Sequence, residues 1–250
     1  MLEVNEIFGP TIQGEGKLVG NPSVFVRFGN CNMSCEGFKV AYETPSGIKK
    51  FSCDSYYASD SAFKEQWNKY ESSKPLIEEV NKLLPSYKVD IVITGGEPLI
   101  YWKDQEFQKF MHYYISMGYK ITIETNASIN IDLTQSWHKE IIFSMSVKLS
   151  NSGESLNKRI NINTLNNIIN LNKESYLKFV ISKDSLDTAS NEIDKLLAQI
   201  NPCDVYLMPM GDTADDIDKN SLSVIELCIQ KGYKYSDRLH IRVWNNKRGV

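Results

Sequence analysis

Short apolar runs alternate with amphipathic segments along most of the chain. Runs rich in β-branched and aromatic residues predict strands. The expected strands are Ser23–Gly29, Val89–Thr94, Lys120–Thr125, Ile141–Val147, Tyr176–Ile181, Cys203–Met210 and Lys234–His240.

Helical periodicity appears between several of these runs. In Asp104–Met117 the apolar side chains share one face, and Gly118 follows as a helix stop. Asp184–Ile200 and Thr213–Lys231 show the same pattern. Strands separated by helices predict βα units around a largely parallel sheet. We therefore expect an α/β fold in the form of an incomplete, modified (β/α) barrel, although a doubly wound sheet has the same local pattern.

Length and charge narrow the possible functions. A chain of 250 residues fits a single domain spanning 1–250, and 28 basic against 31 acidic residues give a net charge of -3. Such a balance gives no general attraction for nucleic acid or anionic membrane. The first residues lack the features of a secretory signal, and no apolar run reaches membrane-spanning length. These features predict a cytoplasmic protein with neither nucleic acid nor membrane as partner.

Three of the five cysteines fall in the first quarter of the chain. Cys31 and Cys35 follow directly after the expected strand Ser23–Gly29, and Cys53 completes a C-x3-C-x17-C pattern. Three thiolates suit iron and leave one iron of a [4Fe–4S] cluster open to another ligand. Closing the longer loop costs about 2 kcal/mol more than closing a two-residue gap. We expect an inserted hairpin to offset this cost, with Phe38–Glu43 and Ile48–Ser52 on either side of a Thr-Pro-Ser-Gly turn.

Two simpler interpretations of the cysteines stay open at this point. Reduced cysteines often behave as small buried hydrophobes, which is the interpretation we favour for Cys203 and Cys228. A structural zinc site would need a fourth ligand, which His240 or one of these two cysteines could supply only through a long-range contact. The second interpretation would make the protein a zinc-stapled binding module rather than an enzyme.

Several motifs together resemble the radical S-adenosylmethionine superfamily. They are Gly29-Asn30-Cys31-Asn32-Met33-Ser34-Cys35, Cys53-Asp54-Ser55 and Thr94-Gly95-Gly96-Glu97-Pro98. With Gln13-Gly14-Glu15-Gly16 and Arg238-Leu239-His240, the chain resembles the 7-carboxy-7-deazaguanine synthase family within it. Members usually carry a C-x3-C-x2-C triplet, so the seventeen-residue gap is a departure, although relatives with an enlarged cluster loop exist.

The resemblance implies a reaction, its cofactors and its partners. In it, 6-carboxy-5,6,7,8-tetrahydropterin is contracted to 7-carboxy-7-deazaguanine with loss of ammonia, for queuosine and other 7-deazapurines. The implied cofactors are a [4Fe–4S] cluster, S-adenosyl-L-methionine and Mg2+, and the implied partners are a second copy of the chain and a flavodoxin-like electron donor. A glycyl-radical activase is the alternative enzyme, because it would share the cluster and the Gly-Gly-Glu-Pro motif.

The resemblance also assigns S-adenosylmethionine contacts to the ends of several strands. These residues are Gly96, Glu97, Glu124, Asn126, Ser146, Val147, Lys148, Met208, Pro209, Met210 and Gly211. Met208 stands where relatives carry Gln. Without the cysteines, we would favour a strand-to-helix turn for the glycine pair. For Glu124-Thr125-Asn126 and Ser146-Val147-Lys148, solvated strand ends are about as good an interpretation.

A pterin needs hydrogen-bond acceptors along its pyrimidine edge and cations at its carboxylate. By these needs and by resemblance, the substrate residues are Ile12, Gln13, Gly14, Glu15, Arg27, Thr94, His240 and the C-terminal Val250. Arg27 could grip a carboxylate through two parallel hydrogen bonds, or it could form a structural ion pair. The tail could equally be a frayed terminus. Ser55, which follows the Cys-Asp pair, is the candidate Mg2+ ligand.

Overall fold

The computed structural model describes residues 1–250. The main sheet consists of β1 (Leu2–Ile12), β2 (Pro22–Phe28), β5 (Asn68–Tyr70), β6 (Asp90–Gly95), β7 (Ile121–Thr125), β8 (Ile141–Met145), β9 (Tyr176–Ile181), β10 (Asp204–Pro209) and β11 (Lys234–Tyr235). A separate hairpin pairs β3 (Val40–Glu43) with β4 (Lys49–Ser52). The helices are α1 (Tyr56–Ser59), α2 (Ser73–Asn81), α3 (Gln105–Ser116), α4 (Leu156–Arg159), α5 (Ile162–Leu171), α6 (Leu186–Leu197), α7 (Ala214–Lys231) and α8 (Leu239–Trp244).

The strand order is β11-β10-β9-β8-β7-β6-β2-β1-β5. From β2 to β11 every neighbouring pair is parallel, whereas β1 and β5 are antiparallel additions beyond β2. Because the parallel strands follow chain order in one direction, the winding is that of a barrel and lacks the reversal of a doubly wound sheet. The sheet stays open, since β5 and β11 do not pair. The expectation of an incomplete (β/α) barrel is confirmed.

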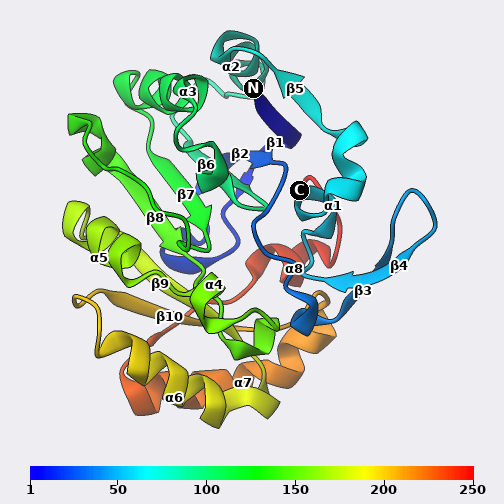
Figure 1. The fold of residues 1–250 in the computed structure, drawn as a ribbon, viewed down its shortest axis with the longest axis vertical. Coiled ribbons are helices and arrows are strands. Elements are labelled where there is room, and N and C mark those ends of the chain that lie inside the picture. The colour runs from blue at the N-terminus through cyan, green and yellow to red at the C-terminus, as the bar shows by residue number, and fades with distance from the viewer.

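Helices cover one side of the curved sheet. Figure 1 shows α3, α5, α6 and α7 around the outside, while α8 lies on the inner side and the β3–β4 hairpin projects away from the body. One apolar cluster of 41 buried residues joins the sheet to these helices. Within it the rings of Phe28 on β2 and Phe107 on α3 meet edge to face, with centroids 5.1 Å apart. None of the helices combines the length and apolar character needed to cross a bilayer.

The hairpin between the second and third site cysteines is present as expected. Its strands pair from Val40 with Ser52 to Glu43 with Lys49, and Thr44 and Ile48 close the turn by a backbone hydrogen bond of 2.9 Å. The hairpin brings Cys53 back beside the start of the loop, because the Ser52 hydroxyl donates to the Ser34 carbonyl at 2.6 Å. Cys35 and Cys53, with seventeen residues between them in the sequence, are therefore brought close together in space.

Sequence patterns missed β1, β5, α2 and α5, and also the short helices α1, α4 and α8. In β1, two register shifts interrupt the alternation on which strand prediction depends. β5 has only three residues, α2 is mostly polar, and α5 is rich in asparagine, a poor helix former.

The expected strand Lys234–His240 is wrong beyond Tyr235. The chain leaves the sheet there, because the Arg238 side chain turns toward two carboxylates and α8 begins at Leu239. His240 therefore lies on a helix.

Candidate active site

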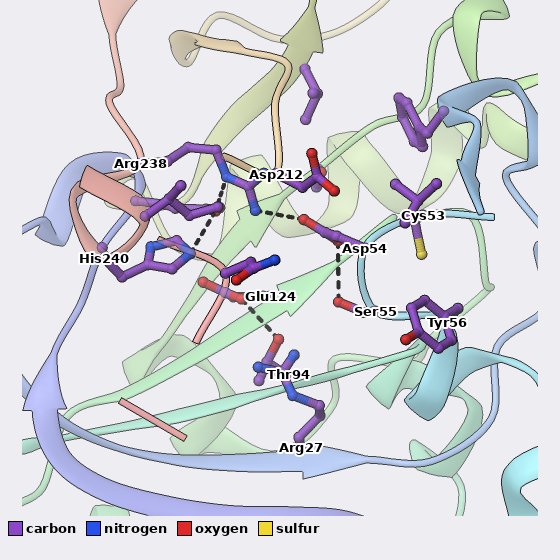
Figure 2. A pocket seen from close by; sticks show the side chains of 18 of the residues that line it. Arg27, Cys53, Asp54, Ser55, Tyr56, Thr94, Glu124, Asp212, Arg238 and His240 are labelled. Carbon is purple, nitrogen blue, oxygen red and sulfur yellow. Dashed lines mark hydrogen bonds and ion pairs between the residues drawn. The ribbon is translucent and has the colours of Figure 1, made fainter. Parts of the chain in front are cut away.

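A cavity of about 700 Å³ opens at the carboxyl ends of the parallel strands. Its walls come from segments far apart in the sequence: the loop after β1, the cysteine loop after β2, the ends of β6 to β10, and α8 with the residues that follow it. This is the end of a barrel-like sheet at which active sites are built. Figure 2 shows side chains from these segments pointing toward one another across the space.

The cavity gathers nearly all the residues selected from the sequence. Every expected substrate residue lines it, from Ile12, Gln13, Gly14 and Glu15 to Arg27, Thr94, His240 and Val250. Of the expected cofactor residues, Gly96, Glu124, Asn126, Ser146, Lys148, Met208, Met210 and Gly211 line it, as do the three cysteines and Ser55. Glu97, Val147 and Pro209 do not reach the cavity surface.

The three thiols occupy one part of this cavity. β2 delivers Cys31, the hairpin returns Cys53, and Cys35 is held in a left-handed conformation with φ of 51°. Burial raises the pKa of each thiol, to about 12 for Cys35, and the nearby thiol of Cys53 adds to the effect on both others. Thiols in such a place ionise readily only when a cation compensates them, which suits an iron centre as donor set.

No three His, Cys, Asp or Glu side chains are gathered closely enough to surround a single metal ion. A tetrahedral zinc ion with bonds of about 2.3 Å would require such a tight group. In addition, neither Cys203 nor Cys228 lines the cavity, so neither can supply the fourth ligand of a zinc site there. Of the residues considered as a fourth zinc ligand, only His240 lines the cavity.

Glu154 fixes the backbone of the cysteine loop, and sequence reasoning missed it. Its Oε1 accepts hydrogen bonds from the backbone N–H groups of Ser34 at 2.6 Å and Cys35 at 3.0 Å, and its Oε2 pairs with Lys158 at 2.8 Å. Although burial favours the neutral acid, Lys158 and the two N–H groups lower the pKa of Glu154 to about 2. No local signal marks this residue, because it comes from a loop 119 positions away from Cys35.

The Gly95–Gly96 pair is required by the chain itself. A side chain at Gly96 would lie 2.1 Å from the Asn30 carbonyl oxygen, and one at Gly95 would lie 2.0 Å from that of Phe28. The end of β6 therefore presses against the start of the cysteine loop, and the glycines make that contact possible. Gly96 also exposes backbone to the cavity, as its expected role requires.

Glu97 is fully buried and bound by its own chain. Its carboxylate accepts hydrogen bonds from the Thr125 hydroxyl at 2.6 Å and from the N–H groups of Asn126 and Leu99 at 2.7 and 3.0 Å. Burial outweighs these donors and raises the pKa of Glu97. The residue thus ties the end of β6 to the end of β7 and holds Asn126 in the cavity wall.

Glu15 is the centre of an ion-pair network under the cavity. Lys178 of β9 pairs with its Oε2 at 2.5 Å, and Arg238 pairs with its Oε1 at 3.0 Å. Burial opposes ionisation, but Lys178, Arg238 and His240 keep the pKa of Glu15 well below its usual value. The motif containing Arg238 was recognised from sequence, whereas Lys178 was missed because it sits inside an ordinary strand pattern.

Arg238 links this network to the third cysteine. Its second terminal nitrogen pairs with Asp54, the neighbour of Cys53, at 2.6 Å, and it also donates to the Gly211 carbonyl. Figure 2 shows this bridge between α8 and the cysteine segment. Ser55 follows, and its hydroxyl donates to Asp54 at 3.3 Å.

Hydrogen bonds of Glu124 connect residues for which the sequence predicts different roles. Glu124 accepts hydrogen bonds from Gln13 at 3.1 Å and from Thr94 at 2.8 Å. The carboxylate expected beside the cofactor ribose therefore also orients two expected substrate residues.

The contacts of Arg27 agree with both interpretations given for it, a structural ion pair and a carboxylate-binding residue. Its Nε donates to Glu6 at 2.7 Å, as a structural ion pair requires, and its guanidinium lies 5.8 Å from the Tyr57 ring centroid. Its two terminal nitrogens make no hydrogen bond with the chain, and the side chain lines the cavity. These nitrogens remain available for a carboxylate.

α8 packs closely against the loop after β1. The Leu239 N–H donates to the Gly14 carbonyl at 2.9 Å, and a side chain at Gly14 would lie 2.0 Å from the His240 ring. Glycine at position 14 thus lets His240 enter the cavity, where its Nε2 lies 3.9 Å from Glu15. Burial lowers the pKa of His240 more than Glu15 raises it, so the ring is neutral at pH 7.

The last residues fold back along the cavity. Residues 245–250 all line it, and Arg248 stacks 3.6 Å from the Tyr57 ring centroid while donating to the Tyr56 hydroxyl at 2.8 Å. Figure 1 shows the C-terminus beside α1. The structure therefore places Val250 at the cavity.

No family model matches the chain, but curated relatives match it along nearly its whole length. The 7-carboxy-7-deazaguanine synthase of Halobacterium salinarum is 31% identical over 269 residues, covering 98% of this chain and 91% of the relative. The enzyme of the same name from Rhodopirellula baltica is 31% identical, with 95% and 85% covered.

Two solved structures share the fold. The crystal structure of QueE from Escherichia coli has a TM-score of 0.66 at 22% identity, covering 96% of this chain and 94% of that chain. The structure of SuiB from Streptococcus suis has a TM-score of 0.52 at 14% identity and covers 87% of this chain, which matches 48% of SuiB. Identity over the full length, together with three cysteines and the Glu15–Arg238 network at one cavity, leads to one assignment. The chain belongs to the 7-carboxy-7-deazaguanine synthase family.

Proposed function

We propose that this chain converts 6-carboxy-5,6,7,8-tetrahydropterin to 7-carboxy-7-deazaguanine with loss of ammonia, using a [4Fe–4S] cluster, S-adenosyl-L-methionine and Mg2+. One observation carries the proposal. Three thiols from positions 31, 35 and 53 share a single cavity with Glu15, Arg27 and His240, in a member of this family. Because the relatives match from end to end, they favour this reaction over a glycyl-radical activase.

Cys31, Cys35 and Cys53 would hold the cluster. Three protein thiolates leave one iron of four without a protein ligand, which is the position that S-adenosylmethionine requires. When bound, the cluster and S-adenosylmethionine supply a radical that abstracts hydrogen from the substrate. The protein orients the reactants and keeps out water, and Glu154 and Ser52 hold the cysteine loop in place.

Residues at the strand ends would bind S-adenosylmethionine. Gly96 offers backbone, Asn126 offers an amide already held at 2.9 Å by Asn32, and Lys148 offers a cation 3.0 Å from the Ser146 hydroxyl. Met208, Met210 and Gly211 would face the adenosine. Glu97, Val147 and Pro209 would act from behind this surface, since they lie outside the cavity lining.

The substrate would lie between two charged regions. Gln13 and Glu15 accept hydrogen bonds from the pyrimidine edge, and the terminal nitrogens of Arg27 bind the carboxylate. Ile12, Gly14 and Thr94 shape the wall, and His240 and the terminal carboxylate of Val250 complete it. Ser55 would contribute one oxygen to Mg2+, an ion that keeps most of its waters and binds substrate oxygens.

The proposed partners follow from the family resemblance. We expect a second copy of this chain and a flavodoxin-like electron donor, and we expect the enzyme to act in the cytoplasm. Sedimentation of the purified protein tests the dimer.

A product assay tests the reaction itself. Cluster-reconstituted protein is incubated anaerobically with carboxytetrahydropterin, S-adenosylmethionine, Mg2+ and a reductant, and the products are measured by mass spectrometry. We expect 7-carboxy-7-deazaguanine and ammonia without stoichiometric consumption of S-adenosylmethionine, because contraction with loss of ammonia alone is redox-neutral. Formation of 5′-deoxyadenosine without conversion of the pterin would show a radical enzyme with another substrate.

A further inference from the structure

Lys178 is a buried cation that the assigned roles do not use. It sits in the middle of β9 with 4% of its side chain exposed, yet it lines the cavity. Its only hydrogen bond is to Glu15, so the remaining donors of its ammonium group are free. Glu124 and Tyr176 also face it, and Glu15 keeps the Lys178 pKa above its usual value despite burial.

The Glu15–Lys178 pair presents a fixed order of polar groups to the cavity. The carboxylate of Glu15 has lone pairs beyond those used by Lys178 and Arg238, and it accepts hydrogen bonds only. The adjacent ammonium donates only. A ligand lying along this part of the cavity wall would meet the acceptor oxygens of Glu15 and, next to them, the donor ammonium of Lys178.

A 2-amino-4-oxo pyrimidine has the complementary order. Its 2-amino group and ring N3–H are donors, and its 4-oxygen is an acceptor. A neutral 4-amino ring reverses two groups, because its amino group places a donor opposite Lys178 and its N3, which carries no hydrogen, places an acceptor opposite Glu15. We propose that Lys178 is a specificity-determining residue that donates to the 4-oxygen of the substrate while Glu15 accepts from its two donors. This inference rests on the proposed function, and it concerns how the same site distinguishes 4-oxo pterins from 4-amino analogues.

Two stable ligands test the discrimination without turnover. They are 6-carboxypterin and 2,4-diaminopteridine-6-carboxylate, which differ in the 4-oxo or 4-amino group and therefore also in whether N3 carries a hydrogen. Dissociation constants are measured by calorimetry on reconstituted protein at pH 7, where both rings are mostly neutral. We expect the wild-type protein to prefer the pterin about tenfold or more, because the diamino ring leaves buried polar groups opposite Lys178 and Glu15 without a partner.

Variants separate recognition from general stability. Lys178→Met should reduce the preference for the pterin at least several-fold, since the reversed contact at position 4 is removed while the one between N3 and Glu15 stays. Lys178→Arg should keep a preference for the pterin. Lys231→Met, which removes an ion pair with Asp194 away from the cavity, should retain the wild-type ratio. A merely structural Lys178 would weaken both ligands together and leave their ratio unchanged.

The outcomes distinguish the inference from the proposed function. An unchanged ratio in Lys178→Met would overturn the inference, even if the wild-type protein converts carboxytetrahydropterin. A wild-type protein that binds neither ligand and forms no deazaguanine would overturn the proposed function and the inference with it. Melting curves show which variants are folded, and Lys178→Gln replaces Lys178→Met if the latter does not fold.

Discussion

Glu154 holds the cysteine loop through the backbone rather than through a thiol. Its carboxylate accepts from two consecutive N–H groups beside Cys35, a residue with φ of 51°. Non-glycine residues in this conformation need surrounding contacts to hold them. A single carboxylate from a distant loop thus fixes the direction of a proposed cluster ligand.

Replacing Glu154 with alanine should therefore reduce cluster retention. Two N–H groups lose their acceptor, which frees the loop; the part-buried N–H of Cys35 is left unsatisfied at a cost of about 1–3 kcal/mol, whereas the exposed N–H of Ser34 can bind water. Iron and sulfide per chain, measured after anaerobic reconstitution, should fall well below the wild-type values. Lys158→Met is the matched control, because it removes the ion pair and leaves the N–H contacts in place. Full iron content in Glu154→Ala would contradict this role.

His240 should make stability depend on pH on the acid side of neutrality. Its folded-state pKa is lowered from 6.5, chiefly by burial, so the unfolded chain takes up a proton more readily. Its contribution is present above about pH 6.5 and is lost as the pH falls through the folded pKa. The difference in unfolding free energy between wild type and His240→Gln should thus shrink from pH 8 to pH 5, as measured by denaturant unfolding.

A parallel variant checks the assignment to His240. His138 is also buried with a lowered pKa, but it lies outside the cavity and bonds to Gln108. The two histidines should make independent contributions to the pH dependence of the unfolding free energy. A pH dependence that survives in His240→Gln and vanishes in His138→Gln would contradict the prediction.

Among the elements, the hairpin, α1 and the tail form one connected unit. Tyr42 on β3 stacks on Tyr56 of α1 with ring centroids 4.3 Å apart, and Tyr56 accepts a hydrogen bond from Arg248. The insertion that separates the cysteines thus supports the residue that fastens the tail. Sequence reasoning predicted the hairpin and the tail but not this contact, because aromatic stacking between distant segments leaves no periodic signal.

Arg248→Ala should release the tail from the cavity. Stacking of a guanidinium on an aromatic ring contributes about 0.5–1 kcal/mol at an exposed site, and the hydrogen bond to Tyr56 is lost as well. Limited proteolysis should cut the variant faster near the C-terminus, and the KM for the pterin should rise several-fold while the fold persists. Lys247→Ala is the control. If a tag added after Val250 leaves turnover and affinity unchanged, the proposed role of the tail is wrong.

At the scale of the whole molecule, the cysteine site and the hydrophobic core are separate. None of Cys31, Cys35 and Cys53 belongs to the apolar cluster of 41 residues, whereas Cys228 does. Cys53→Ser should therefore abolish cluster assembly without unfolding the protein. We expect loss of iron and sulfide with an unchanged far-ultraviolet circular dichroism spectrum. Unchanged iron and sulfide content would refute the assignment of the third ligand.

The parallel part of the fold was predictable because buried parallel strands are continuous apolar runs. β6 and β9 match the expected strands within one residue at each end. β1 was not predictable in this way, since its bulges break the alternation. The strand assigned to Lys234–His240 failed because ion pairs with Glu15 and Asp54, far away in the sequence, redirect the chain.

Motifs identified most of the site, and topology supplied the rest. Gln13 and His240 belong to recognisable segments, and both line the cavity. Lys178 and Glu154 belong to none, because their importance depends on partners 163 and 119 positions away. A single sequence without its fold contains no signal for such partners.

The wall formed by Gly14 and α8 joins segments 220 or more positions apart, as the Gly16–Ser236 and Glu15–Arg238 contacts show. Contacts of such separation require closure of nearly the whole chain, so we expect them to form after the local βα contacts. In a chain whose sheet has formed before this wall, the three thiols would be more accessible to solvent. We expect factors that deliver iron and sulfide to act on this partly folded form, before α8 packs against the loop after β1.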